Sequence, residues 1–367
     1  MTQAAAESRQ FFERLLAAGQ GDATAYLGLA TACAKLGDHG AALAAADQVL
    51  ALQPRNLRAL IVKADQLSAL GDSRSAASFY RAAVGAAPAP QEMPADLRDD
   101  VARASALCAR YAEAFETDLR ERLGSKGLDE PGSRFSESLE ILSGRKQIYF
   151  QEPRHYFYPG LPQLQFYPRN LLPWLDALEA ATADIKAELV ELMREDAAFQ
   201  PYLQRNARLP HTEAHGLFEN PAWSAFYLWK HGELVAQNAA RCPRTVAALR
   251  EVPLADVKGR SPSVIFSLLL PGAHIPPHTG EVNTRLVCHL PLVVPDKCYL
   301  RVGNETRPVA EGSAWAFDDT IEHEAWNGSD RTRVILLFEV WKPELSERER
   351  AQVRGLFESI DAYGAPS

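Results

Sequence analysis

Small apolar residues recur at helical spacing through the first third of the chain, and the pattern repeats itself. Over residues 22–88 the repeat has an offset of 34 positions. The residues that match at this offset are Ala30 and Ala64, Leu36 and Leu70, Gly37-Asp38 and Gly71-Asp72, Ala42 and Ala76, and Pro54 and Pro88. Small residues at the helix crossings and a proline after each second helix predict pairs of antiparallel helices.

This period resembles that of the tetratricopeptide repeat, over two units. Two units cannot bury a core alone, so we expect flanking helices over residues 5–18 and 96–124 to cap them. A generic alanine-rich helical bundle is the alternative interpretation. Repeat stacks commonly bind a peptide or another protein, and the resemblance implies such a partner for residues 1–124.

The pattern changes after a glycine-rich linker at residues 124–132. We expect one helix from an Asn170 cap to residue 193, and a terminal helix from Ser346, which forms a capping box with Glu349. Between them, short apolar runs alternate with glycine and proline turns, which predicts strands. These runs are residues 224–229, 263–270, 284–294, 297–303, 313–317 and 333–341. They favour an antiparallel barrel or a double-sheet jelly roll.

The chain is therefore expected to be a multidomain α and β protein. A helical repeat domain would occupy residues 1–124, and a jelly-roll domain with flanking helices would occupy residues 125–367.

Composition and charge narrow the class of protein. The 367 residues are 47% hydrophobic and 23% charged, with a net charge of −8, so neither a nucleic-acid nor a membrane partner is expected. We found no signal-type segment and no uncharged run long enough to span a bilayer. The 5 cysteines are scattered and form no CxxC pair. Reduced thiols and a cytoplasmic location are the expectation.

Three histidines lie within residues 274–292, HIPPHTGEVNTRLVCHLPL: His274, His278 and His289. His323 follows later, beside another strand. A non-haem Fe(II) site uses neutral imidazoles, and its usual third ligand is an acid, often two residues after the first histidine. That position is Gly280 here. Spacing alone therefore leaves both a metal site and a pair of buried hydrogen-bonding histidines open.

From about residue 133 to 344 the chain resembles the aspartyl/asparaginyl β-hydroxylase family. The resemblance is carried, in order, by RFSESLEILSGRKQIYF, FYPGLP, PHTGEVNTRL, HLPL, FDDTIEHEAWN and RVILLFEVWKPEL. It implies a double-stranded β-helix and an oxygenase that uses Fe(II), 2-oxoglutarate and O2 to hydroxylate a C–H bond. The substrate would be a peptide or protein residue, aspartyl or asparaginyl or another, or a small acid.

The family pattern also implies roles for single residues. His278 and His323 would be the catalytic iron ligands, because members of the family hold iron with two histidines. Arg333 and Ser267 would bind the distal carboxylate of 2-oxoglutarate, since a guanidinium fork can bond both oxygens. His289 would hold the other end of 2-oxoglutarate. The resemblance leaves either water or Glu281 to complete the metal shell. It assigns no role to His274, which we interpret as structural, and we expect Asp318 and Asp319 to order the strand entry and the His323 loop rather than to bind metal.

The substrate wall departs from the animal relatives. Val287, Ala225 and Phe218 stand where the animal enzymes place polar side chains that bind the substrate carboxylate. Arg285 would remain as the main charged contact. These replacements disfavour an aspartyl side chain in an animal-type motif as the substrate, and favour a different peptide residue or a small free acid.

Two functions of different classes follow from these patterns. The first is a working 2-oxoglutarate-dependent hydroxylase. The alternative is a helical-repeat scaffold or sensor whose oxygenase-like domain binds a ligand without catalysis. The presence together of His278, His323, Arg333 and Ser267 favours the enzyme, and turnover of 2-oxoglutarate would discriminate the two.

Overall fold

The computed structural model describes residues 2–128, 130, 132–195, 198–204 and 218–363. Contacts between residues divide the chain into two units, Met1–Ile148 and Tyr149–Ser367. The expected boundary after residue 124 lies earlier, because the helix Arg134–Ser143 makes its contacts with the first unit. No helix among the described residues combines the length and the apolar character needed to cross a membrane.

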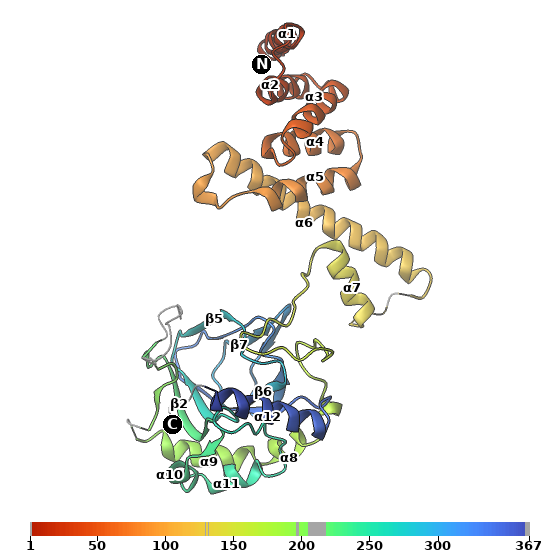
Figure 1. The fold of residues 1–367 in the computed structure, drawn as a ribbon. Coiled ribbons are helices and arrows are strands. Elements are labelled where there is room, and N and C mark those ends of the chain that lie inside the picture. The colour runs from red at the N-terminus through yellow and green to blue at the C-terminus, as the bar shows by residue number, and fades with distance from the viewer. Residues whose placement is uncertain (1, 129, 131, 196–197, 205–217, 364–367) are drawn as a thin grey trace. The chain divides into compact units, whose positions relative to one another are not determined.

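The first unit is a succession of antiparallel helices (Figure 1). They are α1 (Thr2–Ala17), α2 (Ala23–Lys35), α3 (His39–Leu52), α4 (Leu57–Ala69), α5 (Ser73–Ala86), a short 3₁₀ turn (Pro90–Glu92), α6 (Ala95–Gly124) and α7 (Arg134–Ser143). Helix α4 starts 34 residues after α2, and α5 starts 34 residues after α3. The sequence offset is therefore also the offset of the helices. The expected flanking helices correspond to α1 and α6.

Repeated local signals explain why the helices begin and end where they do. The Asp38 and Asp72 side chains accept hydrogen bonds from backbone amides in the first turns of α3 and α5. Before them, Gly37 and Gly71 have φ angles of 75° and 82°, which glycine adopts without strain. The alanines of the repeat are fully buried at the helix contacts: Ala30, Ala42, Ala64 and Ala76. Their assignment to the tetratricopeptide family stays a prediction.

The second unit contains two antiparallel sheets. The larger has the order β1-β2-β4-β11-β6-β9, with β3 paired to β2, and the smaller has the order β5-β10-β7-β8. The chain passes repeatedly from one sheet to the other, as in a jelly roll. The strands are β1 (Gln200–Pro201), β2 (Trp223–Lys230), β3 (Glu233–Leu234), β4 (Val264–Leu269), β5 (His274–His278), β6 (Arg285–Val293), β7 (Cys298–Val302), β8 (Glu305–Pro308), β9 (Trp315–Phe317), β10 (His323–Asn327) and β11 (Arg333–Trp341).

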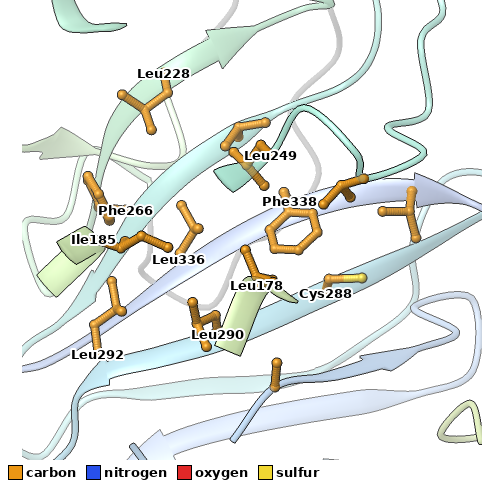
Figure 2. Packing of buried hydrophobic residues seen from close by; sticks show 14 of the residues in the cluster. Leu178, Ile185, Leu228, Leu249, Phe266, Cys288, Leu290, Leu292, Leu336 and Phe338 are labelled. Atoms are coloured by element: carbon orange, nitrogen blue, oxygen red, sulfur yellow. The ribbon is translucent and has the colours of Figure 1, made fainter. Parts of the chain in front are cut away.

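Helices cover one face of the larger sheet. They include α8 (Leu175–Ala180), α9 (Thr182–Leu192), α10 (Ala236–Ala239) and α11 (Pro243–Ala248), and the chain ends with α12 (Glu347–Ala362). Figure 2 shows Leu178 and Ile185 from the helices beside Phe266, Leu336 and Phe338 from the sheet. All five are fully buried, so this face holds the main hydrophobic core.

The other face of the larger sheet is turned toward a cavity, because side chains alternate along a strand. In β11 the even positions Val334, Leu336, Phe338 and Val340 join the core. The odd positions of the same strand line the cavity: Arg333, Ile335, Leu337 and Glu339. In β6 the side chains that pack in the core are Leu286, Cys288, Leu290 and Leu292. Those that line the cavity are Arg285, Val287 and His289. The alternation of side chains along β6 and β11 therefore places apolar residues in the core on one face and polar residues in the cavity on the other.

The helix expected from Asn170 is shorter and broken. Asn170 lies inside a 3₁₀ turn, Arg169–Leu171, and the α-helix begins only at Leu175. Pro173 explains this result, since it disfavours helical backbone at Leu172, whose φ and ψ are −129° and 62°. The capping box of Ser346 and Glu349 is confirmed. The strands β5 and β10 were not predicted.

A buried ion pair ties distant segments of the second unit together. The Asp318 carboxylate accepts hydrogen bonds from Lys342 Nζ at 2.6 Å, Gln151 Nε2 at 2.7 Å and Thr320 Oγ1 at 2.6 Å. The Asp318 and Lys342 side chains are both 0% exposed. Among the described residues, the two charges are compensated by each other, by neutral hydrogen bonds and, for Lys342, by the nearby Tyr167 ring.

We predict that Lys342→Met lowers the free energy of unfolding of the second unit by about 3–5 kcal/mol, because it leaves a buried carboxylate uncompensated. All 6 tryptophans lie within residues 174–341, so tryptophan fluorescence during urea unfolding reports on this unit alone. Lys186→Met is the matched control. Lys186 forms a more exposed ion pair with Glu311, and its loss should cost at most about 1 kcal/mol. Equal effects of the two substitutions would contradict the prediction.

Candidate metal and cosubstrate site

A cavity of about 380 Å³ opens between the two sheets. The larger sheet contributes Ser267, Arg285, Val287, His289, Arg333 and Glu339, and the smaller sheet contributes His278 and His323. The cavity therefore brings together every residue that the sequence assigned to iron and to 2-oxoglutarate.

His278 and His323 form a cross-strand pair. They are register partners on the neighbouring strands β5 and β10, and their ring centroids are 4.1 Å apart. His278 Nδ1 donates to the Pro276 carbonyl at 2.8 Å, and His323 Nδ1 donates to the Ile321 carbonyl at 3.1 Å. Because Nδ1 carries the proton in each ring, Nε2 has its lone pair available for a metal.

Both rings are neutral near pH 7. Burial lowers the pKa of His278. Burial, followed by the neighbouring charge of His278, lowers the pKa of His323 to about 3. Neutral imidazole is the form that binds a metal, so little proton release would accompany binding at physiological pH.

The space beside Gly280 is filled by a carboxylate from another strand connection. A Cβ built on Gly280 would collide with the Asp319 carboxylate, so a larger side chain there would require that carboxylate to move. The Gly280 amide also donates to the Asp319 carbonyl at 2.7 Å. Glu281, in contrast, is held by Arg154 at 2.5 Å and by His155. Asp319, not Glu281, therefore has the carboxylate that lies beside Gly280, and both residues line the cavity.

Arg333 is a buried cation without a counter-ion. Its side chain forms no ion pair with any residue that the structure describes, and its Nε has no hydrogen-bond partner there. Burial lowers the pKa of Arg333 to about 10, so it stays charged at pH 7. An uncompensated buried charge is costly, and an anionic ligand would remove that cost.

His289 and Ser267 lie near this cation. Burial lowers the pKa of His289 well below its usual range, and the charges of Arg333 and His323 lower it further. His289 Nδ1 also lacks a partner among the described residues. The Ser267 hydroxyl accepts a hydrogen bond from Trp223 Nε1 at 3.1 Å, which leaves its own proton free to donate. The three side chains can thus present donors to one ligand.

The residues expected to contact substrate differ in their placement. Val287 lines the cavity, but Ala225 does not, although it is the register partner of Ser267. Arg285 is already paired, with Nη1 2.5 Å from Glu339 Oε1 and Nη2 3.8 Å from Asp319 Oδ2. The side chain expected to be the main charged contact is therefore largely neutralised by its neighbours.

The sequence interpretation did not single out Glu339 and did not place Asp319 in the cavity. The sequence did contain signals for both residues. Glu339 lies on the same face of β11 as Arg333, and Asp319 is only four positions before His323. His274 lies outside the cavity, where Nε2 contacts Glu324 at 2.8 Å. No group of three or more His, Cys, Asp or Glu residues with metal-binding geometry occurs in the part of the chain that the structure describes.

Comparison with known proteins identifies related sequences for this unit. Residues 179–343 match the family model described as aspartyl/asparaginyl beta-hydroxylase. A mouse aspartyl/asparaginyl beta-hydroxylase is 34% identical over 183 residues, which is 48% of this chain and 24% of the mouse protein. An ornithine lipid ester-linked acyl 2-hydroxylase of Rhizobium tropici is 33% identical over 189 residues, 51% of this chain and 63% of that protein.

A third relative extends the match. Aspartate beta-hydroxylase domain-containing protein 2 of Xenopus tropicalis is 30% identical over 251 residues, covering 67% of this chain and 63% of its own length. The chain thus spans less than two thirds of each of these three proteins.

Asp319 predicts a pH dependence of stability in the metal-free protein. Burial raises the pKa of Asp319 to about 7, against the opposing charge of Arg285. The unfolded value is about 3.9, so the folded state binds this proton more tightly and loses stability as pH rises from about 4 through 7. The substitution Asp319→Asn removes this titrating group and with it the loss of stability at higher pH. We expect the variant to gain stability over the wild type as pH is raised from about 5 to 8, measured by urea unfolding.

Asp256→Asn is the control for this experiment. Although burial would raise the pKa of Asp256, hydrogen bonds from Arg354 and Trp341 lower it. Stability from Asp256 is therefore present above the unfolded pKa and lost as pH falls. The stability of Asp256→Asn relative to the wild type should therefore not increase toward alkaline pH. If the stability of both variants changed with pH in the same way, the assignment to Asp319 would be contradicted.

Proposed function

This chain belongs to the aspartyl/asparaginyl β-hydroxylase family, and from that premise we propose that its second unit is an Fe(II)- and 2-oxoglutarate-dependent hydroxylase. One observation carries the proposal. Arg333, which is buried and forms no ion pair with a described residue, lies in the same cavity as two histidines whose Nε2 atoms are available to a metal. A metal and a carboxylate ligand would complement both features at once.

The donor set fits iron. His278 and His323 would hold Fe(II) through Nε2, because each Nδ1 is bonded to a backbone carbonyl. Asp319 Oδ1 is buried and has no partner among the described residues. It would accept a hydrogen bond from a water on the metal. Two protein ligands leave more positions open for small molecules than the usual three.

The cavity also fits 2-oxoglutarate. Arg333 would bind one carboxylate with its planar fork, and the Ser267 hydroxyl would donate beside it. His289, which is neutral and has a free Nδ1, would bond the end nearer the histidine pair. These contacts would hold the two ends of the cosubstrate in the cavity.

Bound iron, 2-oxoglutarate and O2 would supply the oxidising chemistry. The protein would orient these groups and exclude water from them. Apolar side chains around the histidines exclude water from the reacting region. They include Val287, Leu300, Phe317, Ala325, Ile335 and Leu337. The histidine rings are held at fixed tautomers by backbone carbonyls, so little reorganisation is needed when the ligands enter.

The substrate side of the cavity favours a group without negative charge. Arg285 is paired with Glu339, and Asp319 adds a second carboxylate nearby. A substrate carboxylate would meet this acidic surrounding, and among the described residues that line the cavity Arg333 is the arginine without an ion pair. The wall near Trp223 and Tyr202 is aromatic, with ring centroids 4.3 Å apart. We therefore place an uncharged peptide residue or an apolar chain, as the name of the R. tropici relative describes, ahead of an aspartyl side chain or a small acid.

The helical unit would act with this site by recruiting a macromolecular substrate, as tetratricopeptide-like repeats bind other proteins. The alternative function, a scaffold or sensor, would retain ligand binding but show no turnover. Oxygen-dependent conversion of 2-oxoglutarate by iron-loaded protein distinguishes the two.

We predict that His278→Ala and His323→Ala each weaken metal binding by about 100-fold or more. Loss of a direct ligand should exceed the 10–100-fold effect typical of residues behind the ligands. Anaerobic titration of Fe(II) or Mn(II), followed by calorimetry, measures this. His274→Ala is the control, since His274 bonds Glu324 outside the cavity. Retention of one tightly bound metal by the double variant would refute the site.

We predict that Arg333→Lys weakens 2-oxoglutarate binding by about tenfold or more, because a point charge cannot replace two parallel hydrogen bonds. The measurement is anaerobic titration of 2-oxoglutarate into the Mn(II)-loaded protein. Arg331→Lys, an exposed position on the same approach to β11, should bind normally. Metal affinity should stay unchanged in both variants. If Arg333→Lys binds 2-oxoglutarate as the wild type does, the carboxylate lies elsewhere.

A further inference from the structure

A groove of about 1150 Å³ lies on the helical unit, remote in sequence from the residues of the oxygenase cavity. Helix α5 forms one wall, α6 forms the floor and second wall, and the residues that end α7 close one side. The α5–α6 seam that it follows is a direct helix contact. The volume is that of a binding groove for several residues of a peptide.

The charge of the groove is opposite to that of the whole chain. Three arginines line it, Arg74, Arg81 and Arg145, whereas Glu113 is the acidic residue among the described lining positions. The chain as a whole has a net charge of −8. A concentration of arginine in a concave surface of an acidic protein attracts anionic groups.

Two of these arginines have no counter-ion within the described part of the chain. Neither Arg74 nor Arg81 forms an ion pair there. Asp72 lies near Arg74, but its carboxylate accepts the Ser75 amide as the cap of α5. Arg81 is close enough to Cys108 on the floor for its charge to oppose the burial that raises the pKa of that thiol. Both arginines are exposed, so a ligand can reach them.

The third arginine is fixed in place. Arg145 Nη1 contacts Glu116 Oε2 at 3.2 Å, and Arg120 Nε bonds the other oxygen of Glu116 at 2.8 Å. The Glu116 side chain is 4% exposed, while that of Arg145 is 51% exposed. One buried carboxylate thus anchors two cations and leaves the Arg145 side chain facing solvent at the closed side of the groove.

The floor of the groove is made of small side chains. On α6 the positions Ser105, Ala109 and Ala112 recur at helical spacing, and Ala77 lies opposite on α5. Small residues allow the backbone of a bound segment to approach closely. Phe115, 46% exposed, stands at the end of this floor and offers an apolar contact.

We propose that this groove binds an extended acidic peptide segment with two carboxylates three residues apart. Arg74 and Arg81 are seven residues apart on α5 and therefore lie on one face, separated by about 10 Å along the axis. Three residues of chain in the extended polyproline II conformation span nearly the same distance, about 9 Å, and because this conformation has three residues per turn, side chains three positions apart point to the same side. The partner is thus a protein segment of Glu/Asp-x-x-Glu/Asp type. This proposal does not depend on the oxygenase activity of the second unit.

The test uses the full chain and a fluorescein-labelled peptide of about ten residues, which has two glutamates three positions apart among alanine, serine and glycine. Fluorescence anisotropy should show saturable binding that weakens as salt is raised. Matched peptides with glutamine, with lysine, or with adjacent glutamates should bind about tenfold more weakly or worse.

Variants of the protein locate the binding. Arg74→Ala combined with Arg81→Ala should weaken the glutamate peptide by about tenfold or more. Arg55→Ala combined with Arg98→Ala is the control, because both arginines are exposed and lie outside the groove. Arg74→Glu combined with Arg81→Glu should transfer the preference to the lysine peptide. Far-ultraviolet circular dichroism of each variant checks that the helices remain folded.

Several results would overturn the proposal. They are equal affinity for the glutamate and glutamine peptides, undiminished binding by the Arg74 and Arg81 variants, or no binding up to about 1 mM, the affinity of a very weak complex. Single-stranded RNA that displaces the peptide at lower concentration than unlabelled peptide would assign the groove to another class of polyanion and would equally overturn it. Persistence of binding in an iron-free preparation is expected.

Discussion

The buried Asp318 carboxylate is the constraint on which the second unit depends. It joins Lys342 at the end of β11, Gln151 in the segment that enters the unit, and Thr320 in the turn before β10. Gln151 extends the network, since its Oε1 accepts from Asn283 at 3.0 Å, next to the start of β6. Three strands that carry cavity residues are therefore fixed from one point outside the cavity.

Local signals explain how much of the fold could be predicted. The 34-residue offset placed helix boundaries closely because the same glycine-aspartate pair ends one helix and caps the next in both repeats. The apolar run of residues 333–341 predicted β11, because both faces of this strand are covered, one by the core and the other by the cavity walls. Where a local signal conflicted with a neighbour, prediction failed. Pro173 overrode the apparent Asn170 cap, and the two prolines of residues 274–278 concealed β5.

The residues of the cavity could be proposed from the family pattern, but their charge balance could not. A sequence does not show that Arg285 reaches Glu339, since the two lie 54 positions apart and meet only through the pairing of β6 and β11. Nor does it show that the space beside Gly280 receives the carboxylate of Asp319. Both facts arise from register between strands. They support the proposal of an uncharged substrate group, where the sequence had left a different peptide residue and a small free acid both open.

The prolines of β5 have a consequence beyond concealing the strand. β5 is at the edge of the smaller sheet, and Pro276 and Pro277 have no amide hydrogens. Consecutive amides point to opposite sides of a strand, so a foreign strand that paired with this edge would find one donor missing there. The edge that bears His278 is thus protected from self-association, so the histidine can lie at an open rim of the cavity without making the protein prone to aggregate.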